Sequence, residues 1–283
     1  MQGSAQSRPG AAPSAAHRVH LLGGAVDLVT PRDVLRTIDA AALRPGTTLI
    51  ANHNAHSLFL LRRSPQLRAF FAEADLIEID STPLIAWGRL MGLPLKPAMR
   101  STYLDWRDDF WKLAEARRWR VFYLGAAPGV ADEAARRLGP RHPRATIATH
   151  HGYFDPAPGS AENCAVLERI RAFDPDVLMI GMGMPLQEIW ALQNRAALAR
   201  GVILTVGAAF DYEAGVQKAA PRWTGRLGVE WLARLIDQPG RLAFRYLVEP
   251  WWLLGPALGD VGAALGRRAM GMRGATLIRG SAR

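Results

Sequence analysis

Cysteine is nearly missing from this sequence, and long apolar runs do not occur in it. The single cysteine, Cys164, excludes an intramolecular disulfide framework and is consistent with a reducing compartment. The most apolar window, residues 247–258, is interrupted by Glu249 and two prolines, so it is too broken to form a membrane-spanning helix. We therefore predict a chain that does not cross a bilayer. Residues 1–18 consist mainly of Ala, Ser, Pro and Gly without the apolar core of a secretory signal, which predicts a disordered tail.

Acidic residues are scarce towards the C-terminus. The chain carries 35 basic and 25 acidic residues, a net charge of +10. Residues 222–283 hold ten arginines against four acidic residues, a net +6, together with four of the nine tryptophans. We therefore expect residues 222–283 to form a basic, amphipathic helical appendage that contacts an anionic partner.

Short apolar runs alternate with amphipathic segments of helical length over residues 19–221. This alternation is typical of a parallel sheet covered by helices, and about half of the residues are hydrophobic, as in a folded domain. We predict an α/β domain with a Rossmann-like, mostly parallel sheet flanked by helices. The predicted strands are 48–51, 76–79, 121–124, 145–149, 177–180 and 202–206. The predicted helices are 32–42, 55–63, 83–91, 106–117, 129–138, 162–171 and 186–198.

Small, polar or acidic residues follow each predicted strand, at the edge where ligands bind in open α/β sheets. Gly125 follows one strand, and Gly181 and Gly183 follow another. Glycine loops before a helix can cradle phosphate, although a tight turn uses the same residues. Two such loops on one edge favour a nucleotide diphosphate as the ligand. The loops lack the complete dinucleotide fingerprint and the Lys-Ser/Thr pair of a P-loop, which disfavours an NAD-dependent epimerase or dehydrogenase.

Asp80 directly follows a buried strand and precedes Ser81-Thr82-Pro83, which predicts a helix start. An acid here can cap the helix, or Ser81 or Thr82 can cap it and leave Asp80 for chemistry; the spacing leaves both open. Asp211, Asn52 and Asn54 can likewise be plain cap or turn residues. The histidines at 53, 56, 150 and 151 show no metal-binding spacing, so we predict no metal and no cofactor.

Several blocks, in order, resemble the WecG/TagA/CpsF glycosyltransferases from about Leu21 to about Leu254. The blocks are FYLGAAPGVADEAARRL, HHGYFD, DVLMIGMGMPLQEIWALQNR, VGAAFDYEAGVQKAAPRW and GRLGVEWLARLIDQPGRLAFRYL. The resemblance implies inverting transfer of a sugar from a UDP-sugar donor to a polyprenyl-diphosphate-linked sugar acceptor. It also implies that Asp80 is the catalytic base, which removes the proton of the acceptor hydroxyl.

The same resemblance implies the other site residues. Gly125, Gly181 and Gly183 would bind the nucleotide. The implied substrate-binding residues are Asn52, Asn54, Arg100, Gln187, Glu188, Asp211 and Lys218. Some of these depart from the family pattern: Asn52 replaces a common threonine, Ser81 a common glycine, and Ala219 an arginine for which Lys218 is the candidate substitute.

The donor sugar is predicted from three further segments, NHNAHSLFLL, EIDSTPLIAWGRLMG and TYLDW. They resemble the branch that adds glucose in xanthan-type exopolysaccharide synthesis. Glucose is therefore the leading donor sugar. The alternative is transfer of N-acetylmannosamine or its uronate to a lipid-linked N-acetylglucosamine.

The appendage is expected to bring the enzyme to its lipid-linked acceptor. Clustered arginines with tryptophans favour contact with the membrane surface, whereas helical apolar spacing alone would favour packing on the core or on a partner subunit. The arginines expected to contact membrane or acceptor diphosphate are Arg222, Arg226, Arg234, Arg241 and Arg245. These features predict a cytoplasmic enzyme on the inner face of the cell membrane, with a homo-oligomer left open. A non-catalytic nucleotide- or polyanion-binding regulator is the alternative class, although no pattern for nucleic acid occurs.

Overall fold

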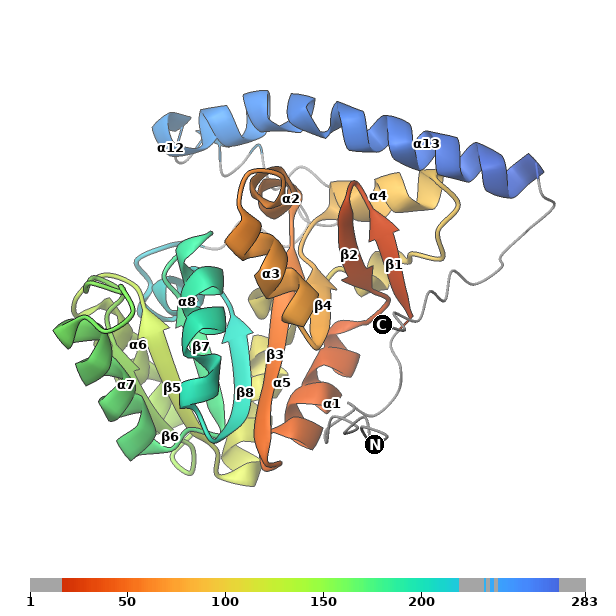
Figure 1. Cartoon of the computed structure of the whole chain (residues 1–283). Coiled ribbons are helices and arrows are strands. Elements are labelled where there is room, and N and C mark those ends of the chain that lie inside the picture. Colours follow the sequence, from red (N-terminus) through yellow and green to blue (C-terminus); the bar gives the residue numbers. More distant parts are fainter. Residues whose placement is uncertain (1–16, 219–231, 233–234, 237–238, 270–283) are drawn as a thin grey trace, which may run out of the picture.

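A six-stranded parallel sheet forms the centre of the molecule. The computed structural model describes residues 17–218, 232, 235–236 and 239–269. The strand order is β4-β3-β8-β7-β5-β6, and every neighbouring pair is parallel (Figure 1). The strands are β3 (Gly46–His53), β4 (Leu76–Ile79), β5 (Arg120–Gly125), β6 (Thr146–His150), β7 (Val177–Gly181) and β8 (Arg200–Thr205). The predicted α/β class is therefore confirmed, and all six predicted strands are present.

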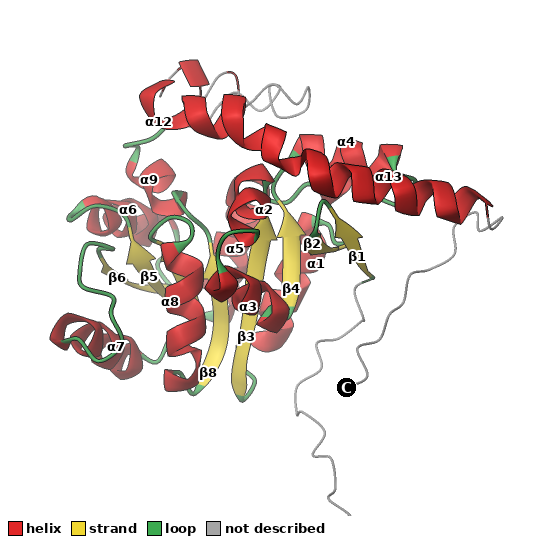
Figure 2. Ribbon diagram, turned by 45° about the horizontal axis from the view of Figure 1, so that its top comes forward, coloured by secondary structure: helices red, strands yellow, loops and turns green. Residues whose placement is uncertain are grey.

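Helices cover both faces of this sheet (Figure 2). One face packs against α1 (Pro31–Ala41), α5 (Tyr103–Arg117), α6 (Val130–Leu138) and α9 (Ala209–Ala214). The other packs against α2 (Ala55–Leu61), α3 (Pro65–Glu73), α7 (Ala161–Phe173) and α8 (Leu186–Asn194), with α4 (Thr82–Leu90) at its end. Short 3₁₀ turns lie at η1 (Pro97–Met99), η2 (Gly139–Arg141) and η3 (Arg195–Ala197).

Burial on both faces explains the near-continuous apolar strands. In β7 all five residues are buried. Leu178 and Ile180 pack into the core on one face of the sheet, and Val177 and Met179 pack into the core on the other face. Helices α3 and α9 were not predicted from the sequence. Nor was the antiparallel hairpin of β1 (Arg18–Leu21) and β2 (Gly24–Asp27).

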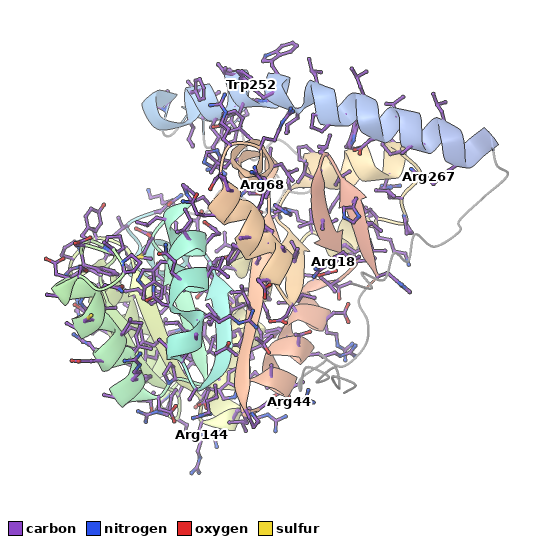
Figure 3. The ribbon with its side chains drawn as sticks, viewed as in Figure 1. Arg18, Arg44, Arg68, Arg144, Trp252 and Arg267 are labelled. Carbon is purple, nitrogen blue, oxygen red and sulfur yellow. The ribbon has the colours of Figure 1, made fainter. Side chains whose placement is uncertain are left out.

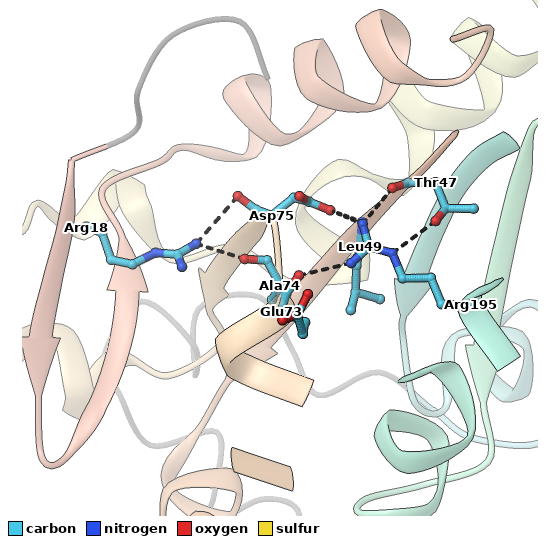
Figure 4. Close-up of polar contacts among 7 residues, drawn as sticks. All are labelled: Arg18, Thr47, Leu49, Glu73, Ala74, Asp75 and Arg195. Carbon is cyan, nitrogen blue, oxygen red and sulfur yellow. Dashed lines mark hydrogen bonds and ion pairs between the residues drawn. The ribbon is translucent and has the colours of Figure 1, made fainter. Parts of the chain in front are cut away.

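Aspartates tie the strands together at their amino ends. Asp75 Oδ2 accepts hydrogen bonds from Leu49 N and Arg195 Nη2, each at 2.8 Å, and Arg195 also donates to Thr47 O at 2.7 Å (Figure 4). Asp176 Oδ2 accepts from Arg120 N at 2.8 Å in the same manner. These charged groups therefore have structural partners, and they lie at the edge opposite the predicted ligand site.

The chain reverses its winding direction between β5 and β7. After β5 the chain moves outwards to β6, whereas after β7 it moves the other way, to β8. The two connecting helices, α6 and α8, accordingly lie on opposite faces. Such a reversal opens a crevice at the carboxyl ends of the two strands, where open α/β sheets bind ligands. The predicted glycine loops follow these two strands.

The C-terminal segment, residues 239–269, crosses the carboxyl edge of the sheet (Figures 1 and 2). It comprises α12 (Pro239–Ala243), the π-helical turn η4 (Phe244–Val248), η5 (Glu249–Leu253) and α13 (Leu254–Ala269). Asp260 Oδ2 accepts hydrogen bonds from Leu22 N at 2.9 Å and Trp87 Nε1 at 2.8 Å. Arg267, labelled in Figure 3, donates to Met91 O at 2.9 Å. One side of this segment is therefore docked on the body of the protein.

Several predictions fall on residues that the structure does not describe. They include residues 1–16 of the predicted tail, Arg222, Arg226, Arg234 and the side chain of Arg241. Within the described part of the chain, no helix is both long enough and apolar enough to span a membrane.

Candidate active site

A cavity of about 410 Å³ opens at the carboxyl edge, beyond the ends of β3 and β4. Its walls come from the start of α2, from α4 and from the C-terminal segment. Leu84 and Trp87 of α4 and Leu253 and Ala257 of the C-terminal segment contribute apolar surface. The polar residues that line it are Asn54, His56, Asp80, Ser81, Thr82, Arg100, Arg245 and Tyr246. The cavity thus combines a large apolar wall with groups of both charges.

Asp80 lines this cavity and lies outside the cap of α4. Its backbone N–H donates to His53 O at 2.8 Å, which extends the pairing of β3 and β4 by one residue. Ser81 is the N-cap residue, and Pro83 lies in the first turn. Of the alternatives that the sequence left open, capping by the Ser81 side chain does not occur, because that side chain makes no capping bond. Asp80 therefore lies in the cavity wall rather than at the cap position.

Asn54 has the capping role that the sequence left open. Its Oδ1 accepts from Ser57 N at 3.0 Å, and the Ser57 hydroxyl accepts from Asn54 N at 2.9 Å. This reciprocal pair starts α2. Asn54 is therefore a cap residue that also lines the cavity.

Arg100 is held beside Asp80 by a short parallel contact with β4. The backbone of Arg100 forms a parallel β-bridge with Ile79, and Ser101 N donates a hydrogen bond to Ile79 O at 2.9 Å. The guanidinium lies 3.6 Å from Asp105 Oδ2. Arg245 of η4 adds a second guanidinium to the same cavity. Two planar forks suit the oxygens of a diphosphate.

Glu78 lies on β4 two residues before Asp80 and is 4% exposed. Ser101 Oγ and Trp106 Nε1 both donate to its Oε2. The pKa of Glu78 is raised to about 7, mainly by burial; the two hydrogen bonds oppose the rise, and the nearby Asp80 and Asp105 add to it. A buried carboxyl that titrates near neutral pH therefore lies two residues before Asp80. From the sequence, Glu78 was predicted only as part of a strand.

The glycine loops lie at the carboxyl ends of β5 and β7, where open α/β sheets form their ligand-binding crevice. Packing within the protein explains two of the glycines. A Cβ on Gly125 would lie 2.4 Å from Gly181 O, and one on Gly181 would lie 2.2 Å from Gly207 O. The strand ends therefore approach too closely for any side chain. Gly183 differs, because its φ of +83° favours glycine while the space around it is open.

Gln187 and Glu188 are each 1% exposed at the start of α8, next to this crevice. Gln187 Nε2 donates to Glu188 Oε1 at 2.6 Å, and Gly183 N donates to Gln187 Oε1 at 3.3 Å. Burial raises the pKa of Glu188 to about 7. Neither residue lines the cavity, so the predicted site residues fall into two groups on one edge.

Three other predicted residues lie outside the cavity wall. Asp211 is in the first turn of α9, directly beyond β8. Asn52 pairs in register with Glu78, and its Oδ1 is buried without a hydrogen-bond partner among the described residues. Lys218 is exposed.

The two groups are close enough to serve one extended ligand. Neighbouring strands lie about 4.8 Å apart, and β3 and β8 separate β4 from β7. The end of β4 is therefore about 14 Å from the end of β7. A molecule that spans this distance could reach both the crevice and the cavity.

The histidines have partners within the protein. His53 is fully buried, its Nδ1 lies 2.8 Å from Ser57 Oγ, and burial lowers its pKa to about 3. His150 Nδ1 lies 2.8 Å from His151 O. Among the described residues no group of three or more His, Cys, Asp or Glu side chains could hold a metal ion.

Arg245 was expected to contact membrane or acceptor diphosphate, and it lines the cavity, whereas the place of Glu249 beside the cavity was not predicted. Glu249, which interrupts the apolar window 247–258, is 4% exposed, and its Oε2 lies 2.7 Å from His56 Nδ1. An acidic residue within an apolar run, such as Glu249 here or Asp80 after its strand, indicates a functional or paired position and could have been used to predict this contact. Trp87 and Leu84 carried no such signal, because apolar residues on a helix are typical of core packing.

The fold and the edge cavity define a protein of the doubly wound α/β class. Residues 19–262 match the glycosyl transferase WecG/TagA/CpsF family. Among the relatives are proteins of Staphylococcus aureus named N-acetylglucosaminyldiphosphoundecaprenol N-acetyl-beta-D-mannosaminyltransferase. Those of strains NCTC 8325 and COL are 31% identical over 201 residues, which covers 67% of this chain and 76% of each relative. The relative in strain MW2 is 30% identical over 199 residues. This chain belongs to the WecG/TagA/CpsF family and is a glycosyltransferase, as its motifs indicated.

Proposed function

We propose that this protein transfers a sugar from a UDP-sugar to a sugar carried on a polyprenyl diphosphate, with inversion at the transferred carbon. The observation that carries the proposal is the cavity in which Asp80 lies with Arg100 and Arg245. An acid can act on an acceptor hydroxyl there, while the two cations can hold the acceptor's diphosphate.

In this reaction Asp80 takes the proton of the acceptor hydroxyl as its oxygen attacks the anomeric carbon of the donor sugar. The bond from that carbon to the diphosphate breaks, and UDP leaves. We place the nucleotide over the crevice between β5 and β7, where Gly183 N, Gln187 and the start of α8 lie. The donor sugar then extends towards β4, across the interval of about 14 Å.

The relatives support N-acetylmannosamine as the transferred sugar and lipid-linked N-acetylglucosamine as the acceptor, because their names specify both. This was the alternative in the sequence analysis, and it now precedes glucose. Glucose remains the second candidate, on the three short segments that resemble the xanthan-type branch.

Substitution of Asp80 by Asn tests the proposal. Purified chain would receive UDP-N-acetylmannosamine or UDP-glucose with a short-chain polyprenyl diphosphate that carries N-acetylglucosamine or glucose. We expect Asp80→Asn to lower kcat about 10²- to 10⁴-fold while UDP binding is retained. Asp109→Asn is the matched control, because Asp109 lies on α5 with its side chain 72% exposed. Normal turnover by Asp80→Asn would remove Asp80 from the base role.

We further propose that the exposed side of the C-terminal segment contacts the membrane that holds the acceptor. The docked side contains Leu253, Asp260 and Ala264 at helical spacing, and the opposite side is apolar yet exposed. The exposed residues of this side are Leu247, Val248, Trp251, Leu254, Leu258 and Leu265. Phe244 and Trp252 are also partly exposed, but their rings contact Phe59 of α2. The segment thus combines both expectations from the sequence, since one side packs on the core and the other suits an interfacial helix.

Flotation with anionic liposomes tests this contact. We expect the double substitution Trp251→Ser with Leu258→Ser to reduce the bound fraction. Tyr153→Ser is the control, because Tyr153 is 71% exposed but lies in the loop after β6. Equal binding by the double variant and the unaltered chain would refute the membrane contact.

A further inference from the structure

The pair His56 and Glu249 joins two parts of the cavity wall that are 193 residues apart in sequence. His56 is in the first turn of α2, and Glu249 begins η5 of the C-terminal segment. Their contact, Nδ1 to Oε2, is 2.7 Å long. Glu249 is 4% exposed, whereas His56 lines the cavity together with Asp80. A nearly buried carboxyl therefore fixes a ring at the surface of the cavity.

The contact with Glu249 also decides which ring nitrogen carries the hydrogen. A carboxylate only accepts hydrogen bonds, so Nδ1 donates and, in the neutral ring, Nε2 presents a lone pair. Among the described residues, Nε2 of His56 has no hydrogen-bond partner. Nε2 is not buried either, because the buried polar atoms without a partner do not include it. Nε2 is therefore an accessible acceptor in a residue of the cavity wall.

We propose that His56 is a substrate-contacting residue whose Nε2 accepts a hydrogen bond from a hydroxyl group of the acceptor sugar, and that Glu249 is its positioning residue. The inference rests on the proposed function, because it assigns the acceptor to this cavity. The two residues that line the cavity then have different roles. Asp80 takes the proton of the attacking hydroxyl, and His56 orients the acceptor sugar through another hydroxyl. Since the C-terminal segment supplies Glu249, docking of that segment on the body completes the acceptor site.

The charged groups around His56 keep its ring in the accepting form. Burial lowers the pKa of His56, the nearby Arg245 lowers it further, and Glu249 opposes both effects. The ring is therefore neutral at pH 7, and Nε2 keeps its lone pair. The other ring near it, Phe59, is stacked with a centroid distance of 6.4 Å and does not titrate.

His56→Asn is the decisive variant, because the Asn side-chain amide can still donate to Glu249 from the position of Nδ1 but has no atom at the position of Nε2. The first measurement is direct binding of a short-chain polyprenyl diphosphate carrying N-acetylglucosamine to the full chain, without a donor. We expect the Kd of His56→Asn to rise about five- to tenfold, the effect of one lost hydrogen bond. In turnover, the KM for this acceptor should rise by a similar factor, with a smaller change in kcat and none in the KM for the UDP-sugar.

Glu249 provides the second pair of variants. Glu249→Ala should weaken acceptor binding as much as His56→Asn, because the ring loses its fixed orientation. Glu249→Gln should restore most of the affinity, since its amide oxygen can accept from Nδ1. Hydrogen exchange over residues 239–269 should be unchanged in His56→Asn, which distinguishes a substrate contact from a clamp on the C-terminal segment.

Unchanged acceptor affinity in His56→Asn would overturn the inference, as would faster exchange of the C-terminal segment in that variant. A kcat that falls more than about a hundredfold at constant acceptor KM would also overturn it, because His56 would then be the base. Absence of acceptor binding by the unaltered chain refutes the inference directly. If the unaltered chain binds the acceptor but transfers no sugar, the proposed function fails while the binding comparison still decides the role of His56.

Discussion

Replacement of Glu78 by Gln should change how the stability of the protein depends on pH. Glu78 is almost fully buried between β4 and α5, and its pKa rises from 4.5 to about 7 on folding, mainly because burial disfavours its charge. The folded protein therefore binds this proton more tightly than the unfolded chain does. The stabilisation is complete below pH 4.5 and is lost as the pH rises towards 7.

The expected magnitude follows from the difference between the two pKa values. A tenfold change in the acid constant corresponds to about 1.4 kcal/mol, so ionisation of Glu78 costs the folded state about 3 kcal/mol once the pH exceeds 7. Gln has the same shape and does not titrate. The free energy of unfolding of Glu78→Gln, relative to the unaltered chain, should therefore increase by about 3 kcal/mol between pH 4.5 and pH 8.

Urea unfolding followed by tryptophan fluorescence at several pH values measures this difference. Glu188, whose pKa is also raised to about 7, is present in both chains, so its contribution cancels. Parallel stability curves from pH 4.5 to 8 would refute the reasoning, since they would mean that Glu78 is already ionised in the folded protein at low pH.

Two further pairs of substitutions test the packing of the strand ends and the docking of the C-terminal segment. Gly181→Ala should destabilise the protein by about 3 kcal/mol or more in thermal unfolding, because the new Cβ would lie 2.1 Å from Tyr123 Oη and 2.2 Å from Gly207 O. Gly129→Ala should cost only about 1–2 kcal/mol, since φ is +80° but the space is open; equal losses would argue against the close approach of the strand ends. Asp260→Ala removes the acceptor of Leu22 N and Trp87 Nε1. Each donor left unpaired destabilises the docked segment by about 1–3 kcal/mol, so hydrogen exchange over residues 254–269 should become faster. Asp260→Asn, which keeps an acceptor oxygen, should exchange nearly as slowly as the unaltered chain, and equally fast exchange in both variants would contradict this account.

Local sequence determined most of the sheet. Strand β7 was predicted correctly because a strand buried on both faces is apolar throughout, and β4 because three of its four residues are apolar. Glycine or a polar residue marks where each strand ends. The start of α4 was predictable because Ser81-Thr82-Pro83 is a local pattern typical of a helix start. The lack of a capping bond from the Ser81 side chain was not predictable. The hairpin of β1 and β2 was missed because its pairing depends on contacts with β4 and on the pair of Arg18 with Asp27.

By itself the sequence determined the α/β class, the edge at which the chemistry lies and the candidate acid Asp80, because these depend on periodicity and on the residue types directly after each strand. Tertiary structure alone decided that Arg100 and Arg245 share a cavity with Asp80, and that Gln187 and Glu188 lie apart from it at the crevice. It also placed Glu249 against His56. Contacts between segments that are far apart in sequence arise only when helices and strands pack, and no local pattern encodes which buried partners will meet.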